Sequence, residues 1–165
     1  MKIRTMNMED LDQVMKIYEK AREYMIEEGN ANQWDKGYPS KELLQEDMQK
    51  KQAYVVDNKG IIEAVFILMG TEEPSYATIE GAWISDKAYG TIHRMASAGN
   101  LPGMGKYCLD WCKERYEHLR VDTHEKNISM RRLIENNDFT YCGIIYVRAH
   151  SPRRAYAYEK KEGKK

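Results

Sequence analysis

Hydrophobic residues recur every three or four positions in the first part of the chain, a spacing that places them on one face of a helix. They are Leu11, Val14, Met15, Tyr18, Ala21, Met25 and Ile26. Asn7, three residues before Asp10, is placed to cap this helix, and Gly29-Asn30 is placed to end it. A second, shorter helix is expected after Ser40, a typical N-cap residue. Residues 31–39 between the two helices have no periodicity and are expected to form a loop.

The pattern then changes to short runs rich in β-branched residues, which are typical of strands. Asp57-Asn58-Lys59-Gly60 separates two such runs and predicts an antiparallel hairpin. Further strands are expected at residues 2–5, 89–96, 119–123, 139–147 and 155–159, with a short strand or turn at 78–84 and helices at 106–116 and from Asn127 or Ser129 onward. The unit from Thr91 to Thr123 should form a right-handed parallel crossover. The sheet should therefore be mixed, with helices packed on it.

Length and composition favour one globular domain, residues 1–165, because the 165-residue chain shows no internal repeat, linker or low-complexity segment. Its 26 basic residues balance 26 acidic ones, so neither a nucleic acid nor an anionic membrane is expected as a partner. No run approaches the ~18 apolar residues of a membrane span. A cleaved secretory signal is not expected either. The basic segment 153–165 is predicted to be a solvated end.

Cys108, Cys112 and Cys142 are an odd number of cysteines in a chain that can build its own core. Reduced thiols and a cytoplasmic location are therefore expected. Cys108 and Cys112 lie four residues apart on a predicted helix, where packing in the core is favoured over metal binding. No second cysteine pair and no matching histidine spacing supports zinc, so no metal site is predicted.

The stretch Asn100-Leu101-Pro102-Gly103-Met104-Gly105 lies between a predicted strand and a predicted helix. Glycines spaced in this way let the backbone approach a ligand, and amide N–H groups stay unpaired at the positive end of the helix dipole. Such a turn can bind a phosphate group. Lys106 is followed by Tyr107 rather than by the Ser or Thr of a P-loop, which argues against phosphotransfer. The turn therefore predicts a bound cofactor; the alternative is a tight turn without a ligand.

These residues resemble the GCN5-related N-acetyltransferase (GNAT) superfamily. In that family a strand leads into a Gln/Arg-x-x-Gly-x-Gly/Ala turn whose amides bind the pyrophosphate of acetyl-CoA, and Asn100-x-x-Gly103-x-Gly105 fills this pattern. The second family block is a strand, an Asn that opens a short helix, and a Gly-Phe pair before a long strand. Residues 119–124, Asn127 and Asp138-Phe139 match it. The resemblance implies an α/β (α+β) fold with a mixed, mostly antiparallel central sheet and helices on both faces.

The resemblance also implies roles for individual residues. Amides of residues 101–106 would hold the pyrophosphate, Lys106 could add charge to a phosphate, and the backbone of Met95 and Ser97 would pair with the pantetheine arm. Asn127 would hydrogen-bond the pantetheine or orient the thioester. The expected cofactor-binding set is Met95, Ser97, Asn100, Leu101, Pro102, Gly103, Met104, Gly105, Lys106 and Asn127.

The chain departs from the family pattern at several positions. Asn100 occupies the position where the family prefers Gln or Arg, and Asp138 occupies that of a glycine. The connection 97–99 between strand and glycine turn is shorter than is usual in the family. Ile134 stands where many members carry a tyrosine that protonates the departing thiolate. An active transferase of this sequence would need another proton donor, or water in its place.

Acetyl transfer to an amine benefits from a base whose pKa lies near the working pH. His93 is the first candidate, because in a regular strand it shares a face with Met95 and Ser97. A buried structural histidine is the alternative. Glu80 is the second candidate, with a surface carboxylate as its alternative. Asp122 and His124 could also face the cleft, and a tyrosine such as Tyr141 or Tyr146 could replace the missing proton donor.

Trp34, Tyr38, Trp83 and Tyr89 are expected to line an acceptor pocket or, equally, to fix long loops to the sheet. The main hypothesis is an enzyme that moves the acetyl group of acetyl-CoA to a primary amine of a small molecule or peptide, by direct attack while both are bound. One alternative is a non-catalytic acyl-CoA-binding module of the same fold. Another is a scaffold protein without a cofactor. A homodimer is left open.

Overall fold

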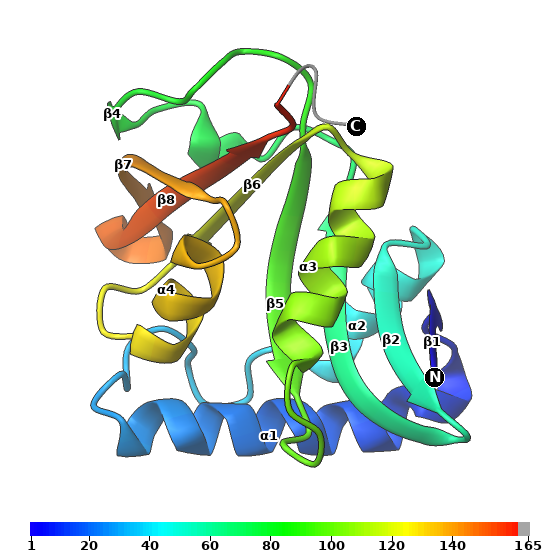
Figure 1. Ribbon diagram of the computed structural model, residues 1–165. Helices are drawn as coiled ribbons and strands as arrows, with labels where there is room; N and C mark the ends of the chain where they lie inside the picture. The colour runs from blue at the N-terminus through cyan, green and yellow to red at the C-terminus, as the bar shows by residue number, and fades with distance from the viewer. Residues whose placement is uncertain (162–165) are drawn as a thin grey trace.

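The computed structural model describes residues 1–161, and in this range the strands form one sheet (Figure 1). Across the sheet the order is β1 (Lys2–Thr5), β2 (Ala53–Asn58), β3 (Ile61–Met69), β5 (Gly90–Ser97), β6 (His118–Thr123), β8 (Ser151–Glu159), β7 (Thr140–Val147) and β4 (Glu80–Gly81). Neighbouring strands are antiparallel except β5 and β6, which are parallel. The predicted mixed, mostly antiparallel sheet is confirmed.

Capping side chains precede three of the helices, α1, α2 and α4, among the described residues. The helices are α1 (Leu11–Glu27), α2 (Lys41–Gln49), α3 (Met104–Arg115) and α4 (Ile128–Glu135), and short 3₁₀ turns lie at Met8–Asp10, Pro74–Tyr76 and Arg148–His150. Asn7 and Asp10 form a reciprocal capping box before α1. The Ser40 hydroxyl accepts a hydrogen bond from the backbone N–H of Leu43 at 3.1 Å, and so caps α2.

The sheet is covered on both faces, because side chains of β3 alternate between two cores. Ala64, Phe66 and Leu68 contribute to a core that contains residues of α3 and α4, including Cys108 and Cys112. Val65 and Ile67 contribute to a second core with residues of α1 and α2. Helices on both faces were expected and are confirmed. The two helix cysteines pack in the core, where burial raises the pKa of the Cys108 thiol to about 12.

A β-bulge interrupts β5 at Arg94. Val65 faces Ala96 across the β3–β5 ladder, whereas Ile67 faces His93, so β5 holds one extra residue. Arg94 adopts φ of 48°, a left-handed conformation that is uncommon for a residue other than glycine. A bulge of this kind reverses the alternation of side chains beyond it.

After Thr91, three residues before the bulge, β5 and β6 diverge. Their parallel ladder holds Gly90 opposite Leu119 and Thr91 opposite Arg120, and it includes no later pair among the described residues. Figure 1 shows the two strands close together at one end and spread at the other, where the N-terminal end of α3 lies beside β5. The parallel crossover predicted for Thr91 to Thr123 thus produces a V-shaped opening in the sheet.

The edge strand β4 approaches β7 very closely. A Cβ at Gly81 would lie 2.2 Å from the carbonyl oxygen of Cys142, and one at Gly143 would lie 2.1 Å from that of Glu80. Only residues without a side chain fit at this contact. The two-residue strand β4 can therefore pair with β7.

The C-terminal segment differs from the expectation of a solvated end. Strand β8 begins at Ser151, four residues before the expected start, and includes the basic residues Arg153 and Arg154. Arg153 is 4 % exposed. A run of basic residues predicts an exposed segment, but a guanidinium can be buried when oxygen atoms accept its hydrogen bonds, as the carbonyls of Pro152 and Gln33 do for Arg153. Residues 162–165 of the predicted tail lie outside the described residues.

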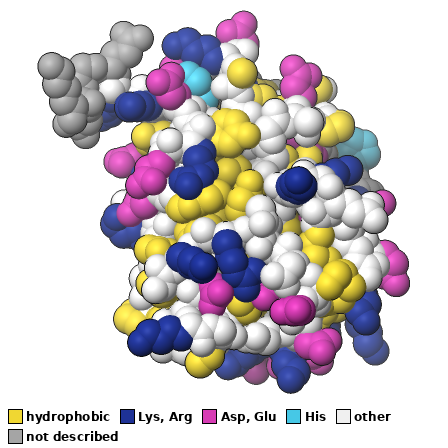
Figure 2. Space-filling view, turned by 90° about the vertical axis from the view of Figure 1, so that its right-hand side faces the viewer, with side chains coloured by type: hydrophobic (Ala, Val, Ile, Leu, Met, Phe, Trp, Pro, Cys, Tyr) yellow, Lys and Arg dark blue, Asp and Glu magenta, His cyan; other side chains and the backbone are white. Residues whose placement is uncertain are grey.

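Figure 2 shows the side of the molecule beyond β1, where Lys and Arg side chains alternate with Asp and Glu around exposed hydrophobic side chains. This mixture agrees with the equal numbers of basic and acidic residues in the sequence. Among residues 1–161, no helix combines the length and the apolar character that crossing a membrane requires.

Gly105 sits where α3 approaches α4, and this contact leads to a stability prediction. A Cβ at Gly105 would lie 2.6 Å from the Cδ2 of Leu133. Gly105→Val should therefore lower the free energy of unfolding by about 1–3 kcal/mol through overpacking, measured by denaturant titration. The double variant Gly105→Val/Leu133→Ala should lose less stability than the sum of the losses of the two single variants, because the shorter side chain at position 133 leaves room for the valine. Full additivity would contradict this packing account.

Candidate functional site

A cavity of about 1000 Å³ occupies the opening between β5 and β6. Its walls come from both faces of the sheet: α1, α2 and the loop between them, β5, the N-terminal end of α3, β6, α4 and the region around Val147–Arg153. The opening therefore connects the α3/α4 face with the α1/α2 face. Two ligands that enter from opposite faces could meet in it.

On the α3/α4 face, the predicted phosphate turn lies at the cavity wall. Gly103 is the N-cap of α3 in a left-handed conformation with φ of 77°. The first hydrogen bond of the helix runs from the N–H of Tyr107 to the carbonyl of Gly103, so the preceding amides of Met104, Gly105 and Lys106 have no partner within the helix. Such N–H groups, at the positive end of a helix dipole, form an anion-binding site.

Other residues of the predicted turn are placed differently. The Asn100 side chain donates to the Glu63 carboxylate at 3.1 Å, and Leu101 packs against the core under α3. Neither these residues nor Pro102 line the cavity. Lys106 lines it, but its ammonium also forms an exposed ion pair with Asp110 at 2.6 Å.

Asn127 lies at the cavity wall and begins α4. Its side-chain oxygen accepts from the N–H of Met130 at 3.2 Å, and its amide group donates to Gln33 at 3.1 Å. Ile134, at the position of the family's tyrosine, is fully buried and has no hydroxyl to offer.

Of the described tyrosines, Tyr24 and Tyr38 are the ones that line the cavity. The Tyr24 hydroxyl lies 3.1 Å from the hydroxyl of Ser129, which also lines it.

The prediction that His93, Met95 and Ser97 share one face is wrong. His93 lies opposite Ile67 and therefore faces α1 and α2, whereas Ser97 lies opposite Ala64 and Met95 packs against the α3 core. The bulge at Arg94 is the cause, because one extra residue reverses the alternation of side chains. All three residues still line the cavity, from its two faces.

His93 contacts a carboxylate that the sequence did not single out. Its Nε2 lies 3.4 Å from Oε2 of Glu73, and both side chains are 19 % exposed. The contact with His93 holds the pKa of Glu73 below its ordinary value, and a hydrogen bond from the Ser75 hydroxyl at 2.7 Å acts in the same direction. Glu73 is therefore an ionised partner for the imidazole.

Asp122 lies across the opening from His93 and also lines the cavity. The Tyr76 hydroxyl donates to its carboxylate at 2.7 Å. Burial raises the pKa of Asp122, against the opposing influence of His93. The sequence offered Asp122 among several groups that could face the cleft, together with His124, which does not line the cavity.

The bulge itself is fixed by side chains of the α1/α2 face. The Arg94 guanidinium donates to the Asp47 carboxylate of α2 in a close ion pair, and to the Tyr38 hydroxyl at 3.3 Å. The Tyr18 hydroxyl of α1 donates to the backbone carbonyl of Arg94 at 2.8 Å. Arg94 and Asp47 are 11 % and 4 % exposed, so this ion pair is shielded from water.

The predicted aromatic residues divide into two groups. Trp34 and Tyr38 line the cavity with ring centroids 6.2 Å apart. Trp83 and Tyr89 lie outside the cavity wall, where their rings hold the Arg120 guanidinium at 4.1 and 4.0 Å. They belong to a third small core, so they fix loops to the sheet.

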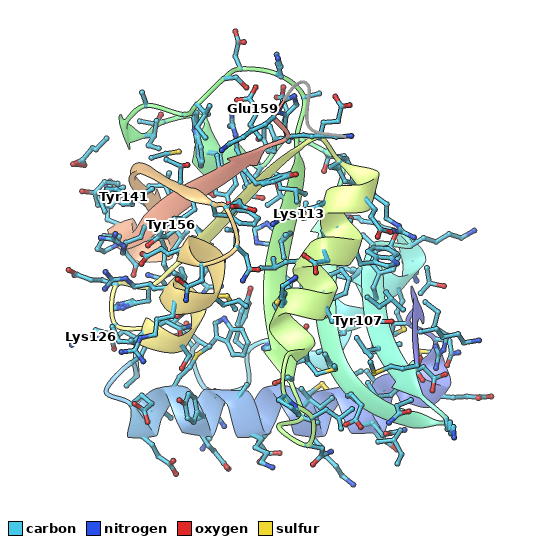
Figure 3. All side chains as sticks on the ribbon, viewed as in Figure 1. Tyr107, Lys113, Lys126, Tyr141, Tyr156 and Glu159 are labelled. Atoms are coloured by element: carbon cyan, nitrogen blue, oxygen red, sulfur yellow. The ribbon has the colours of Figure 1, made fainter. Side chains whose placement is uncertain are left out.

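Glu80 and the proposed substitute tyrosines are not at the cavity. Glu80 is exposed on β4, at the edge of the sheet. Figure 3 shows Tyr141 beside Tyr156, on the β7/β8 side of the sheet, and their ring centroids are 5.7 Å apart. Tyr146 is exposed on β7. The structure does not bring these three residues to His93.

Solved structures of similar fold match nearly the whole chain. An acetyltransferase of the GNAT family from Streptococcus agalactiae 2603 superposes with a TM-score of 0.88 at 28% sequence identity, covering 98% of this chain and 96% of its own. A GNAT-family acetyltransferase from Listeria monocytogenes 4b F2365 has a TM-score of 0.71 at 13% identity, covering 96% and 94%. An N-acetyltransferase from Staphylococcus aureus Mu50 has a TM-score of 0.62 at 16% identity, covering 97% and 98%.

A scan of family models finds no match to this sequence, and a search of curated proteins finds none either. The similarity therefore rests on the fold, over nearly the whole chain. The resemblance to the GNAT superfamily expected from the sequence motifs is confirmed by these structures.

The ion pair that fixes the bulge leads to a second stability prediction. Asp47→Ala should lower the free energy of unfolding by about 3–5 kcal/mol, because it leaves the buried charge of Arg94 without its partner. Asp110→Ala, which removes the partner of Lys106 in an exposed pair, is the control and should cost no more than about 1 kcal/mol. Denaturant titration measures both. An equal loss of unfolding free energy in both variants would show that the Arg94–Asp47 ion pair stabilises the fold no more than an exposed ion pair does.

Proposed function

Because this chain has the fold of GNAT-family acetyltransferases over almost its full length, we propose that it is an N-acetyltransferase that moves the acetyl group of acetyl-CoA to a primary amine of a small molecule or a peptide. The divergence of β5 from β6 beside the N-terminal end of α3, within one cavity, carries the proposal. Diverging strands leave backbone groups free for an extended ligand. The helix start supplies N–H groups for its phosphates.

The residues at the opening fit acetyl-CoA. A Cβ at Gly103 would meet no atom within 4 Å, so no neighbouring side chain blocks the turn at this position. Ser97 pairs with Ala64 of β3, and β6 does not pair with the end of β5 that carries Met95 and Ser97. The amides of residues 103–106 would hold the pyrophosphate, and this free edge of β5 would hold the pantetheine arm.

When bound, acetyl-CoA would supply a thioester carbonyl that is already activated toward an amine. The main contribution of the chain is then to hold donor and acceptor together in the opening, where correct positioning can lower the barrier by about 7–11 kcal/mol. No covalent intermediate on the protein is needed. The buried thiols of Cys108 and Cys112 agree with this direct route.

His93 is the base of this proposal. With the ionised Glu73 beside its Nε2, the neutral imidazole carries its proton on Nε2 and leaves Nδ1 to accept a proton from the attacking amine. The imidazolium formed in this way would be stabilised by Glu73, the ionised carboxylate in contact with it. A histidine oriented by a carboxylate is a common form of general base.

The leaving thiolate needs a proton, and Ile134 cannot supply one. The hydroxyls of Tyr24 of α1 and Ser129 of α4, which lie 3.1 Å apart at the cavity wall, are substitutes that this wall offers. We assign the Tyr24 hydroxyl as the proton source, with Ser129 as the group that orients it.

The second candidate function is a non-catalytic acyl-CoA-binding module. The complete burial of Ile134 at the position of the family's proton donor favours it. The two functions are separated by incubating the protein with acetyl-CoA and a panel of amines, while thiol release is followed and CoA binding is titrated by calorimetry. Thiol release above background with an amine supports the transferase. Binding heat without release supports the module, and the absence of binding heat overturns both.

The role of His93 is tested by its pH dependence. His93→Ala should reduce transfer about 10²–10⁴-fold at neutral pH, and much less at high pH, where the amine loses its proton unaided. The control is His118→Ala, which removes a half-buried histidine that lies 3.7 Å from Glu159, outside the cavity. An unchanged rate of the His93 variant at both pH values would exclude His93 as the base.

The phosphate turn is tested by a pair of glycine variants. Gly103→Val should weaken CoA binding at least ~10-fold, because the side chain would displace phosphate from charge-assisted hydrogen bonds worth about 1.5–3 kcal/mol. Gly60→Val is the control: Gly60 has φ of 91° and equally free surroundings, but lies in the β2–β3 turn. Both variants carry similar backbone strain, so calorimetry should separate them by CoA affinity alone. Normal CoA affinity of the Gly103 variant would argue against this turn as the phosphate-binding site.

A further inference from the structure

Two arginines in the same cavity as the candidate base have no carboxylate partner within 4.0 Å among the described residues. Arg148 and Arg153 both line the cavity, and neither forms an ion pair with a carboxylate of the described residues within 4.0 Å. Arg153 is 4 % exposed, although burial of an uncompensated charge is costly. In contrast, the other deeply placed arginine of this cavity, Arg94, is neutralised by Asp47.

Neutral oxygens hold the Arg153 guanidinium in place. Its nitrogens donate to the Ser151 hydroxyl at 2.5 Å, to the carbonyl of Pro152 at 2.9 Å and to that of Gln33 at 3.2 Å. These contacts orient the group but leave its positive charge without a balancing anion in contact. Burial and the nearby Arg148 lower the pKa of Arg153, while Asp122 and Asp35 act in the opposite direction from a distance.

Arg148 is held by an aromatic ring rather than by an acid. Its guanidinium carbon lies 4.5 Å from the centroid of the Tyr38 ring, which is itself part of the cavity wall. The side chain is exposed at the mouth of the cavity. A guanidinium in this position offers its N–H fork to a planar anion, and a carboxylate matches that fork with two parallel hydrogen bonds.

Acidic side chains line the same cavity near the two arginines. Asp122 lies on the strand next to β8, directly opposite Ala155, two residues from Arg153. Glu73 and His93 follow on the far side of the opening. The α1/α2 face of the cavity thus presents an acid-and-base end that suits an amine, and beside it a cationic end that suits an acid.

We propose that the acceptor is an amino acid, whose amine faces His93 and whose carboxylate binds Arg148 and Arg153. This inference rests on the proposed acetyl transfer and specifies its substrate class. An amine without a carboxylate would leave the buried charge of Arg153 unbalanced, and so would bind less well.

The test compares acceptors that differ only in the carboxylate. Thiol release from acetyl-CoA is measured with the standard amino acids and, for the best of them, with its amide and its decarboxylated amine. The free amino acid should have the highest kcat/KM, by about 10–100-fold over both derivatives, as expected for hydrogen bonds between charged groups. Equal or better transfer to the decarboxylated amine overturns the inference and leaves the proposed acetyltransferase standing. The absence of thiol release from any acceptor overturns both.

Variants then assign the effect to the arginines. Arg148→Gln, at an exposed position where the fold should tolerate it, should raise the KM of the amino acid about 10-fold or more, and leave that of the decarboxylated amine unchanged. Arg153→Lys keeps the buried charge and should retain part of the preference. The control is Arg132→Gln, an exposed arginine of α4 outside the cavity wall, which should change neither KM. A loss of kcat/KM in Arg148→Gln that is equal for both acceptors would contradict a carboxylate contact.

Discussion

The ion pair between Arg94 and Asp47 is the contact on which the geometry of the cavity depends. It ties the one residue of β5 that bulges out of the ladder to α2, and so keeps a left-handed backbone conformation at a residue that has a side chain. The bulge in turn directs His93 to one face of the sheet and Met95 to the other. Without it, β5 would carry both side chains on the same face.

Divergence of the strands separates two tasks between the two faces. The α3/α4 face carries the backbone amides of the glycine turn, which need no side-chain chemistry to bind phosphate. The α1/α2 face carries the titratable groups, His93 with Glu73 and Asp122, beside the two arginines. Since one cavity joins both faces, a donor and an acceptor can approach from opposite sides without competing for space. The proposed direct transfer relies on this division.

Periodicity in the sequence predicted the helices, the strands and a mixed sheet, the family resemblance implied the rest of the fold, and neither predicted the geometry of the site. The helices and strands followed from hydrophobic spacing and from caps such as Asn7 and Ser40, because these signals are local. The bulge gave no signal, since Arg94 is neither a glycine nor an asparagine, and its conformation depends on Asp47, 47 positions away in the sequence. Glu73 was missed because it lies in an aperiodic loop. The burial of Arg153 had no signal in the sequence either, because it stands in a basic C-terminal segment of the kind that is usually exposed.

The sheet ends on both sides in short strands, four residues in β1 and two in β4. A long, flat outer strand would present a row of free N–H and carbonyl groups to a neighbouring molecule, and so invite aggregation. Here the close glycine contact pairs β7 with β4, so that the outermost strand on that side is only two residues long. Short edge strands of this kind leave little free backbone on which a neighbouring molecule could continue the sheet.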